Sequence, residues 1–134
     1  MTEHRLAFAR AAEAFVGTPF RLRGRCARTG VDCIGLVVLA LSSICRPVPP
    51  IPAYTLRQTD LGGLLPVIAQ AGFAPADDAR GAGDLLMLRP GPAQHHLAIV
   101  TAPDRIVHAH AGLRRVVSSS LPAAPDITGH WRID

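Results

Sequence analysis

The chain has 134 residues, of which 49% are hydrophobic, and it carries a formal net charge of +4 at pH 7. This composition favours one domain over residues 1–134 and excludes intrinsic disorder, because a chain of this length can bury most of its apolar surface in a single core. No apolar run approaches the roughly 18 residues of a membrane-spanning helix, and the first residues lack the pattern of a signal peptide. We therefore expect a protein made in the cytoplasm, without a membrane span.

Arginine supplies all 14 of the Lys and Arg residues, and a basic surface favours anionic partners such as nucleic acid or cell-wall polymer. The densest group lies in one segment, at Arg21, Arg23, Arg25 and Arg28. Phe20 is the only aromatic residue beside it, so nucleic-acid binding is not expected. The three cysteines lack C-x-x-C spacing, which argues against a disulfide framework and a cysteine zinc site and fits a reducing compartment.

The first predicted element is an amphipathic helix over residues 3–16. Its apolar residues recur at helical spacing, at Phe8, Ala11, Ala12, Phe15 and Val16. Gly17-Thr18-Pro19 ends it. Residues 20–30 contain two glycines and four arginines and are predicted to be an exposed loop.

A buried helix is predicted from Cys33 to about Cys45, with Asp32 as its N-cap. No residue from Cys33 to Leu41 is charged, and a helix that is apolar on all sides is buried. The first turn lies at the positive end of the helix dipole, which can lower a thiol pKa from about 8.5 to between about 3.5 and 7.5. We therefore expect Cys33 to be a thiolate nucleophile at neutral pH; the alternative is a buried cysteine that only fills space.

The second half of the chain changes from helix to strand signals. Four prolines between residues 47 and 52 predict an extended connector through Tyr54, and Asp60 is predicted to cap a short helix through Ala69. Short runs rich in Val, Ile and Leu then predict strands at 84–88, 96–101, 105–110, 114–118 and 131–133. Helices followed by consecutive strands indicate an α+β fold in which a C-terminal antiparallel sheet packs against the cysteine helix.

Four of the six histidines fall on two adjacent predicted strands, at His95, His96, His108 and His110. Side chains alternate along a strand, so His95 and His96 point to opposite faces while His108 and His110 share one. With a turn near Pro103, His96 and His108 are predicted to lie roughly opposite each other. One face of the sheet can therefore present a histidine pair.

A cysteine at a helix start, facing a histidine that a second polar residue orients, is the arrangement of thiol acyl-transfer enzymes. The thiolate attacks a carbonyl carbon, the imidazole carries protons, and the third group fixes the imidazole tautomer. The backbone N–H of Cys33 can serve as an oxyanion donor. Two alternatives are open from the residues alone: the histidines are ordinary core or surface residues, or His96, His108 and His110 bind zinc on one sheet face.

Five motifs, in order and over nearly the whole chain, resemble those of the NlpC (NlpC/p-sixty) cysteine peptidases of bacterial cell walls. They are Gly17-Thr18-Pro19-Phe20, Gly30-Val31-Asp32-Cys33-Ile34-Gly35-Leu36, Gly83-Asp84-Leu85, His96-Leu97-Ala98-Ile99-Val100 and Ile106-Val107-His108-Ala109. Two further segments resemble the phage-tail branch of this family, which includes gene-transfer-agent proteins: Pro52-Ala53-Tyr54 and Val116-Val117-Ser118-Ser119.

The resemblance implies a papain-like fold with Cys33 as nucleophile, His96 as general base and acid, and His108 as the orienting residue, with His110 as its rival. No metal or cofactor is expected. The implied substrates are peptide stems of peptidoglycan, typically cut between D-glutamate and diaminopimelate. The implied setting is a phage-tail-like particle, with other tail proteins as partners, that crosses the cell wall.

Two residues depart from the family pattern. Phe20 stands where a tyrosine hydroxyl usually helps to hold the oxyanion or the substrate, and losing one such donor can cost on the order of a hundredfold in rate. Ile34 stands where serine is most common; that position and Asp32 are implicated in holding the free amine of the stem peptide. The predicted substrate-binding residues are thus Asp32, Phe20 and Ile34.

These departures leave one alternative of another class: a structural tail-tip component with the same fold and little or no turnover. Amidase or acyltransferase chemistry on the same fold is a further alternative, which would differ only in the leaving group and the acceptor. Cys26, seven positions before Cys33, could regulate the nucleophile by oxidation or could be a loop cysteine without a role, and the sequence leaves both open.

Overall fold

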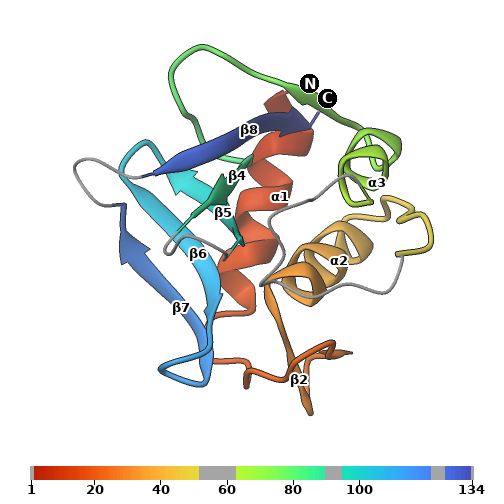
Figure 1. Ribbon diagram of the computed structural model, residues 1–134, viewed down its shortest axis with the longest axis vertical. Coiled ribbons are helices and arrows are strands. Elements are labelled where there is room, and N and C mark those ends of the chain that lie inside the picture. Colours follow the sequence, from red (N-terminus) through yellow and green to blue (C-terminus); the bar gives the residue numbers. More distant parts are fainter. Residues whose placement is uncertain (1, 52–62, 90–94, 122–125, 134) are drawn as a thin grey trace.

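The computed structural model describes residues 2–51, 63–89, 95–121 and 126–133. Within them the chain forms a mixed α+β structure, which confirms the predicted fold class (Figure 1). The helices are α1 (Thr2–Ala14), α2 (Cys33–Ser43) and α3 (Leu65–Gln70). The strands are β1 (Arg25–Cys26), β2 (Gly30–Val31), β3 (Phe73–Pro75), β4 (Asp84–Leu88), β5 (His96–Ala102), β6 (Arg105–His110), β7 (Arg115–Ser120) and β8 (Ile127–Ile133).

Six strands form one antiparallel sheet in the order β3-β8-β4-β5-β6-β7. β4 and β6 coincide with predicted strands, β5 and β7 differ from the predictions only at their ends, and β8 begins at Ile127 instead of Trp131. β3 was not predicted, because its three residues are too few to show a period of two. Pairing with β8 gives that short segment its order.

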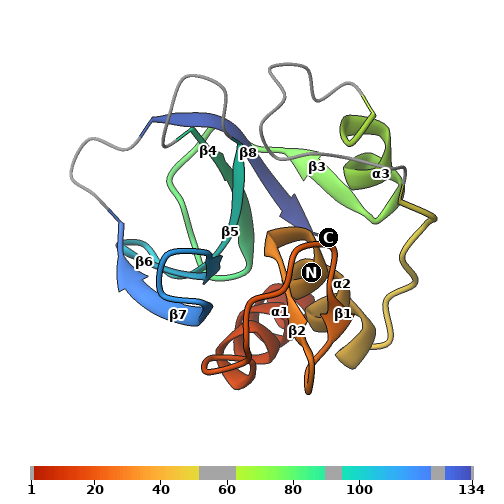
Figure 2. The same cartoon turned by 60° about the horizontal axis from the view of Figure 1, so that its bottom comes forward.

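The helices α1 and α2 pack against each other and against β5, so both lie over one face of the sheet (Figures 1 and 2). Phe8 of α1 and Leu36 of α2 are fully buried there, together with Ile99 of β5 and Val107 of β6. Each buried side chain of this size contributes about 1.5–3 kcal/mol to the free energy of unfolding. A smaller apolar cluster around Leu86 covers the opposite face.

The segment 20–30, predicted as a loop, contains a two-stranded antiparallel hairpin. β1 pairs with β2 through Arg25 opposite Val31 and Cys26 opposite Gly30. The loop prediction was wrong at this point, because two-residue strands carry no hydrophobic periodicity. Their order comes from tertiary contact: the hairpin rests on the first turn of α2, where Gly35 leaves room for the carbonyl of Gly24.

The helix predicted to begin at Cys33 is confirmed at its start, since α2 begins at Cys33, and the helix ends at Ser43 instead of about Cys45. α1 likewise ends two residues before the predicted end. The predicted cap at Asp60 and the end of the proline connector lie outside the described residues. Within the described chain, every helix is too short or too polar to cross a membrane.

The pairing of β4 with β8, inside the sheet, is fixed by a buried ionic cluster around Asp84. Its carboxylate accepts from the Nε of Arg132 at 2.9 Å, from the Nε2 of His130 at 2.6 Å and from the backbone N–H of Gly81 at 3.0 Å. Because Asp84 is fully buried, these donors replace the water that it loses on folding. His130 and the Gly83-Asp84-Leu85 motif thus have a structural role in joining β8 to β4.

Replacing Gly35 by Ala is expected to destabilise the fold, although alanine is the better helix former by about 1 kcal/mol. The added Cβ would overlap the carbonyl oxygen of Gly24 and force the hairpin off α2. We expect a loss of about 1–3 kcal/mol in the free energy of unfolding, measured by urea denaturation. Gly81→Ala is the matched control, because nothing lies within 4 Å of its added Cβ. Equal stability of the two variants would contradict the packing of the hairpin on α2.

Candidate active site

Cys33 is the first residue of α2, and its side chain is buried against the start of β5. Asp32 precedes it as N-cap and accepts a hydrogen bond from the backbone N–H of Gly35 at 2.8 Å. The sulfur of Cys33 accepts from the backbone N–H of Leu97, the residue after His96. The thiol therefore reaches the strand immediately beside the predicted base.

The Asp32 carboxylate is fully enclosed by protein donors. Besides Gly35, the backbone N–H of Arg23 donates to it at 2.8 Å, and the guanidinium of Arg25 forms an ion pair with it at 3.3 Å. These contacts join the β1–β2 hairpin to the helix start. Asp32 was predicted to bind substrate. In this structure its buried carboxylate binds the hairpin and the first turn of α2.

His96 and His108 form the hydrogen-bonded histidine pair that strand alternation suggested. The Nε2 of His96 lies 2.7 Å from the Nδ1 of His108. The strand register pairs Ile99 with Val107, so the two histidines are diagonal neighbours instead of directly opposite residues as predicted. The turn accounts for the difference: Ala102 pairs with Arg105, so the turn is centred between Pro103 and Asp104, whereas pairing His96 with His108 requires a turn centred on residue 102.

The histidine pair continues into β7. The Nε2 of His108 lies 3.0 Å from the Oγ of Ser119. A neutral imidazole carries one N–H, so a hydrogen on the Nε2 of His96 leaves its Nδ1 free to accept a proton. The same assignment gives His108 a hydrogen on Nε2, which it donates to Ser119. The chain of three side chains is thus compatible with the tautomer that a general base needs.

The other two histidines of these strands have different surroundings. The ring of His110 lies 5.6 Å from that of His108, and its Nδ1 accepts from the backbone N–H of Leu113 at 3.0 Å, so it is engaged in the β6–β7 turn. His95 is buried, and neither of its ring nitrogens has a hydrogen-bond partner within the described part of the chain. In that same part of the chain, no three His, Cys, Asp or Glu side chains gather so that they could hold a metal ion.

Burial raises the pKa of the Cys33 thiol to about 12, and the nearby charge of Asp32 acts in the same direction. The backbone N–H groups of Leu97 and Ile34 oppose this effect but do not overcome it. The expectation of a thiolate from the helix dipole was therefore wrong for the resting chain. The free energy lost when a thiolate is removed from water is larger than the stabilisation that the helix N-terminus gives to its charge.

Burial also lowers the pKa of His96 to about 4, with further lowering by the neighbouring imidazoles of His108 and His110. The pKa of His108 is likewise lowered to about 4, first by burial and then by His110. Both imidazoles are therefore neutral at pH 7. The resting site holds a neutral thiol beside a neutral base, and among the described contacts no hydrogen bond yet joins the thiol to the His96 ring.

Phe20 and Ile34, the other predicted substrate-binding residues, both pack on the core beside Cys33. Phe20 is half-buried, and its backbone N–H donates to the carbonyl of Arg114 at 2.9 Å. Ile34 is buried and lines a cavity of about 40 Å³ between α2, α3 and the sheet, whose lining residues are all apolar. A space of this size holds at most a small aliphatic group, and Ile34 offers no polar atom to an amine.

The sequence reasoning missed Ser119 as a member of the hydrogen-bond chain and missed both arginine contacts to Asp32. Ser119 could have been found once the β6–β7 register was known. His108 pairs with Val117, and the residue two positions further along β7 is on the same face. The arginine contacts had no signal in the sequence, because they depend on a hairpin that periodicity does not predict.

Comparisons with solved structures reveal the fold. The chain is 26% identical to the NlpC/p60 domain of the peptidoglycan hydrolase SagA, with a TM-score of 0.60, and the match covers 92% of this chain and 95% of that one. It is 22% identical to the peptidoglycan hydrolase RipB of Mycobacterium tuberculosis, with a TM-score of 0.64 and 99% and 66% of the two chains covered. NlpC2 of Trichomonas vaginalis is 14% identical, with a TM-score of 0.71 and 97% and 46% covered.

This is the NlpC/P60 fold. The papain-like architecture predicted from the sequence is thereby confirmed. The chain spans nearly the whole SagA domain but less than half of the Trichomonas protein. No protein-family model matches the sequence. A search of curated protein sequences also finds no match.

The thiols are expected to differ in their reaction with iodoacetamide. Hydrogen bonds from the backbone and side chain of Thr29 lower the pKa of the exposed Cys26 to about 7, whereas Cys33 is buried with a raised pKa. At pH 7 and below, we expect Cys26 to be alkylated at least tenfold faster than Cys33, since the thiolate is the reactive form. Peptide mass spectrometry over a pH series measures both rates. Faster alkylation of Cys33 than of Cys26 at pH 6 would show that the resting nucleophile is already ionised.

Proposed function

We propose that the chain is a cysteine peptidase that hydrolyses peptide stems of bacterial peptidoglycan. The observation that carries the proposal is the hydrogen-bond chain from His96 through His108 to Ser119, at the point where the buried Cys33 meets β5. Two proteins of the same fold, SagA and RipB, are peptidoglycan hydrolases, which supports the substrate class.

The reaction begins with the transfer of the thiol proton of Cys33 to the Nδ1 of His96. The sulfur attacks the carbonyl carbon of the scissile amide, and the oxygen of the tetrahedral intermediate accepts from the backbone N–H of Cys33 at the start of α2. His96 then gives its proton to the leaving amine, and the C–N bond breaks. His96 then takes a proton from a water molecule, which attacks the thioester carbonyl; the C–S bond breaks, the acid leaves, and His96 returns the proton to the sulfur, which restores the thiol.

His108 orients His96 in each of these steps. Its Nδ1 accepts from the Nε2–H of His96, so the Nδ1 of His96 stays available for the thiol proton. When His96 becomes an imidazolium, the same hydrogen bond becomes charge-assisted and stronger. Ser119 plays the equivalent part for His108 by accepting from its Nε2.

The finer parts of the proposal rest on the sequence motifs. The bond that we propose is the one between D-glutamate and diaminopimelate, because the resemblance of the nucleophile and histidine motifs to the NlpC peptidases implies it. The proposed setting is a phage-tail-like particle or gene transfer agent, whose other tail proteins would be partners of this chain. That setting would bring a chain made in the cytoplasm to the cell wall.

One observation favours a second candidate, a structural tail-tip component without turnover. Phe20 has no hydroxyl to donate to an oxyanion or a substrate, and its backbone is fixed by the Arg114 carbonyl. If this candidate is correct, the folded wild-type chain releases no stem fragments and Phe20→Tyr creates activity.

Replacing Cys33 by Ala is expected to abolish the release of stem-peptide fragments from purified muropeptides, because no other group in the site can form the thioester. Liquid chromatography with mass spectrometry measures the products. Cys26→Ser is the matched control, and we expect it to retain wild-type activity. Undiminished cleavage by the Cys33 variant would contradict the proposed nucleophile.

The pH profile of kcat/KM is expected to keep its acid limb near pH 4. His96 acts as a base only when neutral, and its pKa of about 4 keeps it neutral at pH 5–6, where an ordinary histidine with a pKa of about 6.5 is largely protonated. His108→Gln is expected to lower kcat by tenfold or more and to move this limb, since it changes the partner of His96. An acid limb near pH 6.5 in the wild type would contradict the buried, neutral base.

A further inference from the structure

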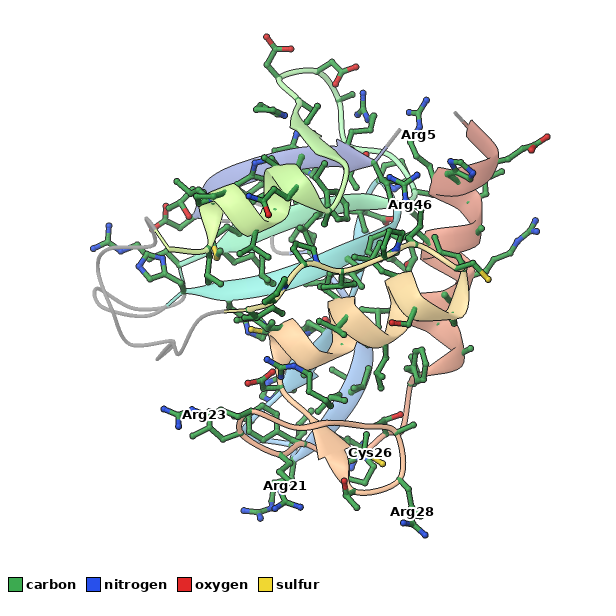
Figure 3. All side chains as sticks on the ribbon, turned by 90° about the vertical axis from the view of Figure 1, so that its right-hand side faces the viewer. Arg5, Arg21, Arg23, Cys26, Arg28 and Arg46 are labelled. Atoms are coloured by element: carbon green, nitrogen blue, oxygen red, sulfur yellow. The ribbon has the colours of Figure 1, made fainter. Side chains whose placement is uncertain are left out.

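Exposed arginines gather at the end of the molecule that carries the β1–β2 hairpin. Two segments form this end, residues 17–33 and residues 111–117. Backbone hydrogen bonds join them: Phe20 donates to Arg114 at 2.9 Å, and Val116 donates to Thr18 at 2.8 Å. We call these two segments together the arginine end. Their exposed arginines are Arg21, Arg23, Arg28, Arg114 and Arg115. Figure 3 shows the first three extending from the hairpin, away from Arg5.

The charge of the chain is concentrated at the arginine end. The two segments contain six arginines and one acidic residue, a formal charge of +5, whereas the other residues together carry −1. The single acidic residue is Asp32, which is buried and paired with Arg25. Counting the exposed Glu13 of α1 with this end still leaves it at +4, the charge of the whole chain.

The arginine end adjoins the nucleophile through named contacts. The backbone N–H of Arg23 and the guanidinium of Arg25 both bind the carboxylate of Asp32, the residue before Cys33. Arg21 donates through its backbone to the carbonyl of Val31 at 3.0 Å. Arg115 begins β7, the strand that also carries Ser119. The backbone that carries the exposed arginines is therefore packed beside the start of α2.

We propose that the arginine end binds peptidoglycan through free carboxylates of stem peptides and so holds the polymer while a neighbouring stem is cut. This inference rests on the proposed function. Glutamate and diaminopimelate each have two carboxyl groups. When one of the two forms an amide bond within the stem peptide, the other stays a free carboxylate. A peptidoglycan strand therefore presents carboxylates at repeated positions. Guanidinium groups bind carboxylates through two parallel hydrogen bonds, so arginine suits this task better than lysine.

Nucleic acid is the other polyanion that a basic surface could attract, and the exposed side chains between these arginines do not favour it. Leu22 and Leu113 are the exposed large apolar side chains within the two described segments, at 61% and 51% exposure, and neither can stack on a base as an aromatic ring does. The hairpin that carries Arg21, Arg23 and Arg28 also contacts the start of α2, which bears Cys33. The carboxylate-bearing substrate of the Cys33 site is the partner that we infer.

The test measures sedimentation of the full chain with purified sacculi in a Cys33→Ala background, so that binding is separated from cleavage. The variant is Arg21→Gln/Arg28→Gln/Arg115→Gln, which spares Arg23 and Arg114 because their backbones have positive φ angles. The matched control, Arg10→Gln/Arg89→Gln/Arg105→Gln, removes the same charge from exposed positions elsewhere. At low salt, we expect the Arg21/Arg28/Arg115 variant to bind sacculi about tenfold more weakly and the control variant to bind almost as the parent does. The binding of the Arg21/Arg28/Arg115 variant is also expected to depend less on salt concentration.

Sacculi whose carboxylates have been converted to amides are expected to lose the binding that the arginine variant loses. Equal binding of the two triple variants, or full binding of amidated sacculi, would overturn the proposal, as would tighter arginine-dependent binding to duplex DNA at the same salt. Wild-type chain that binds sacculi through these arginines but releases no stem fragments would refute the proposed hydrolysis and leave the binding surface standing.

A second measurement needs no sacculi and reports the local potential directly. Cys26 lies in the hairpin and is exposed, and the exposed Cys45, just beyond the other end of α2, serves as an internal reference. For each cysteine, we compare the reaction rate with an anionic methanethiosulfonate to the rate with a cationic one. We expect this ratio of rates to be higher at Cys26 than at Cys45. The arginine variant is expected to reduce the ratio at Cys26 several-fold. A ratio that is the same at both cysteines would contradict a basic field at this end.

Discussion

The buried carboxylate of Asp32 is the interaction on which the site depends. It caps α2, accepts a hydrogen bond from the backbone N–H of Arg23 and pairs with Arg25, so one side chain joins α2 to the β1–β2 hairpin. Without it, the backbone N–H groups of Gly35 and Arg23 would lose this acceptor, at a cost of about 1–3 kcal/mol each. The same contacts place arginines beside Cys33, which links the architecture of the site to the proposed binding of an anionic polymer.

Burial sets the chemistry of the site more strongly than the helix does. The start of α2 favours a negative sulfur, but enclosure raises the thiol pKa to about 12 and lowers the pKa of His96 to about 4. The resting pair is therefore neutral, and in the proposed mechanism charge develops only when His96 takes the thiol proton. The backbone N–H of Leu97 and the chain through His108 to Ser119 are already placed to stabilise that charge. A buried, protonated thiol is less reactive than an exposed thiolate, so the resting Cys33 is expected to resist oxidation.

Local signals were sufficient for the main elements of the fold. The Asp32-Cys33 helix start, the strand β6 and the shared face of His96 and His108 all follow from capping and alternation. Features that depend on tertiary packing were not accessible: the β1–β2 hairpin has strands of two residues, the β5–β6 register contains a shift, and β3 is ordered by β8. The thiol pKa was predicted with the wrong sign for the same reason, because the sequence reports the helix dipole but not the burial of the sulfur.

The most direct test of this account is to trap the thioester on Cys33. Wild-type chain would be mixed with a stem peptide of peptidoglycan, quenched with acid within milliseconds to seconds, and analysed by intact-protein and peptide mass spectrometry. The account predicts a mass increase equal to the acyl part of the stem peptide, located on Cys33 and present in a variant that lacks Cys26 and Cys45. Release of stem fragments without any adduct on Cys33 under conditions of rapid quenching, or an adduct located on Cys26, would contradict it.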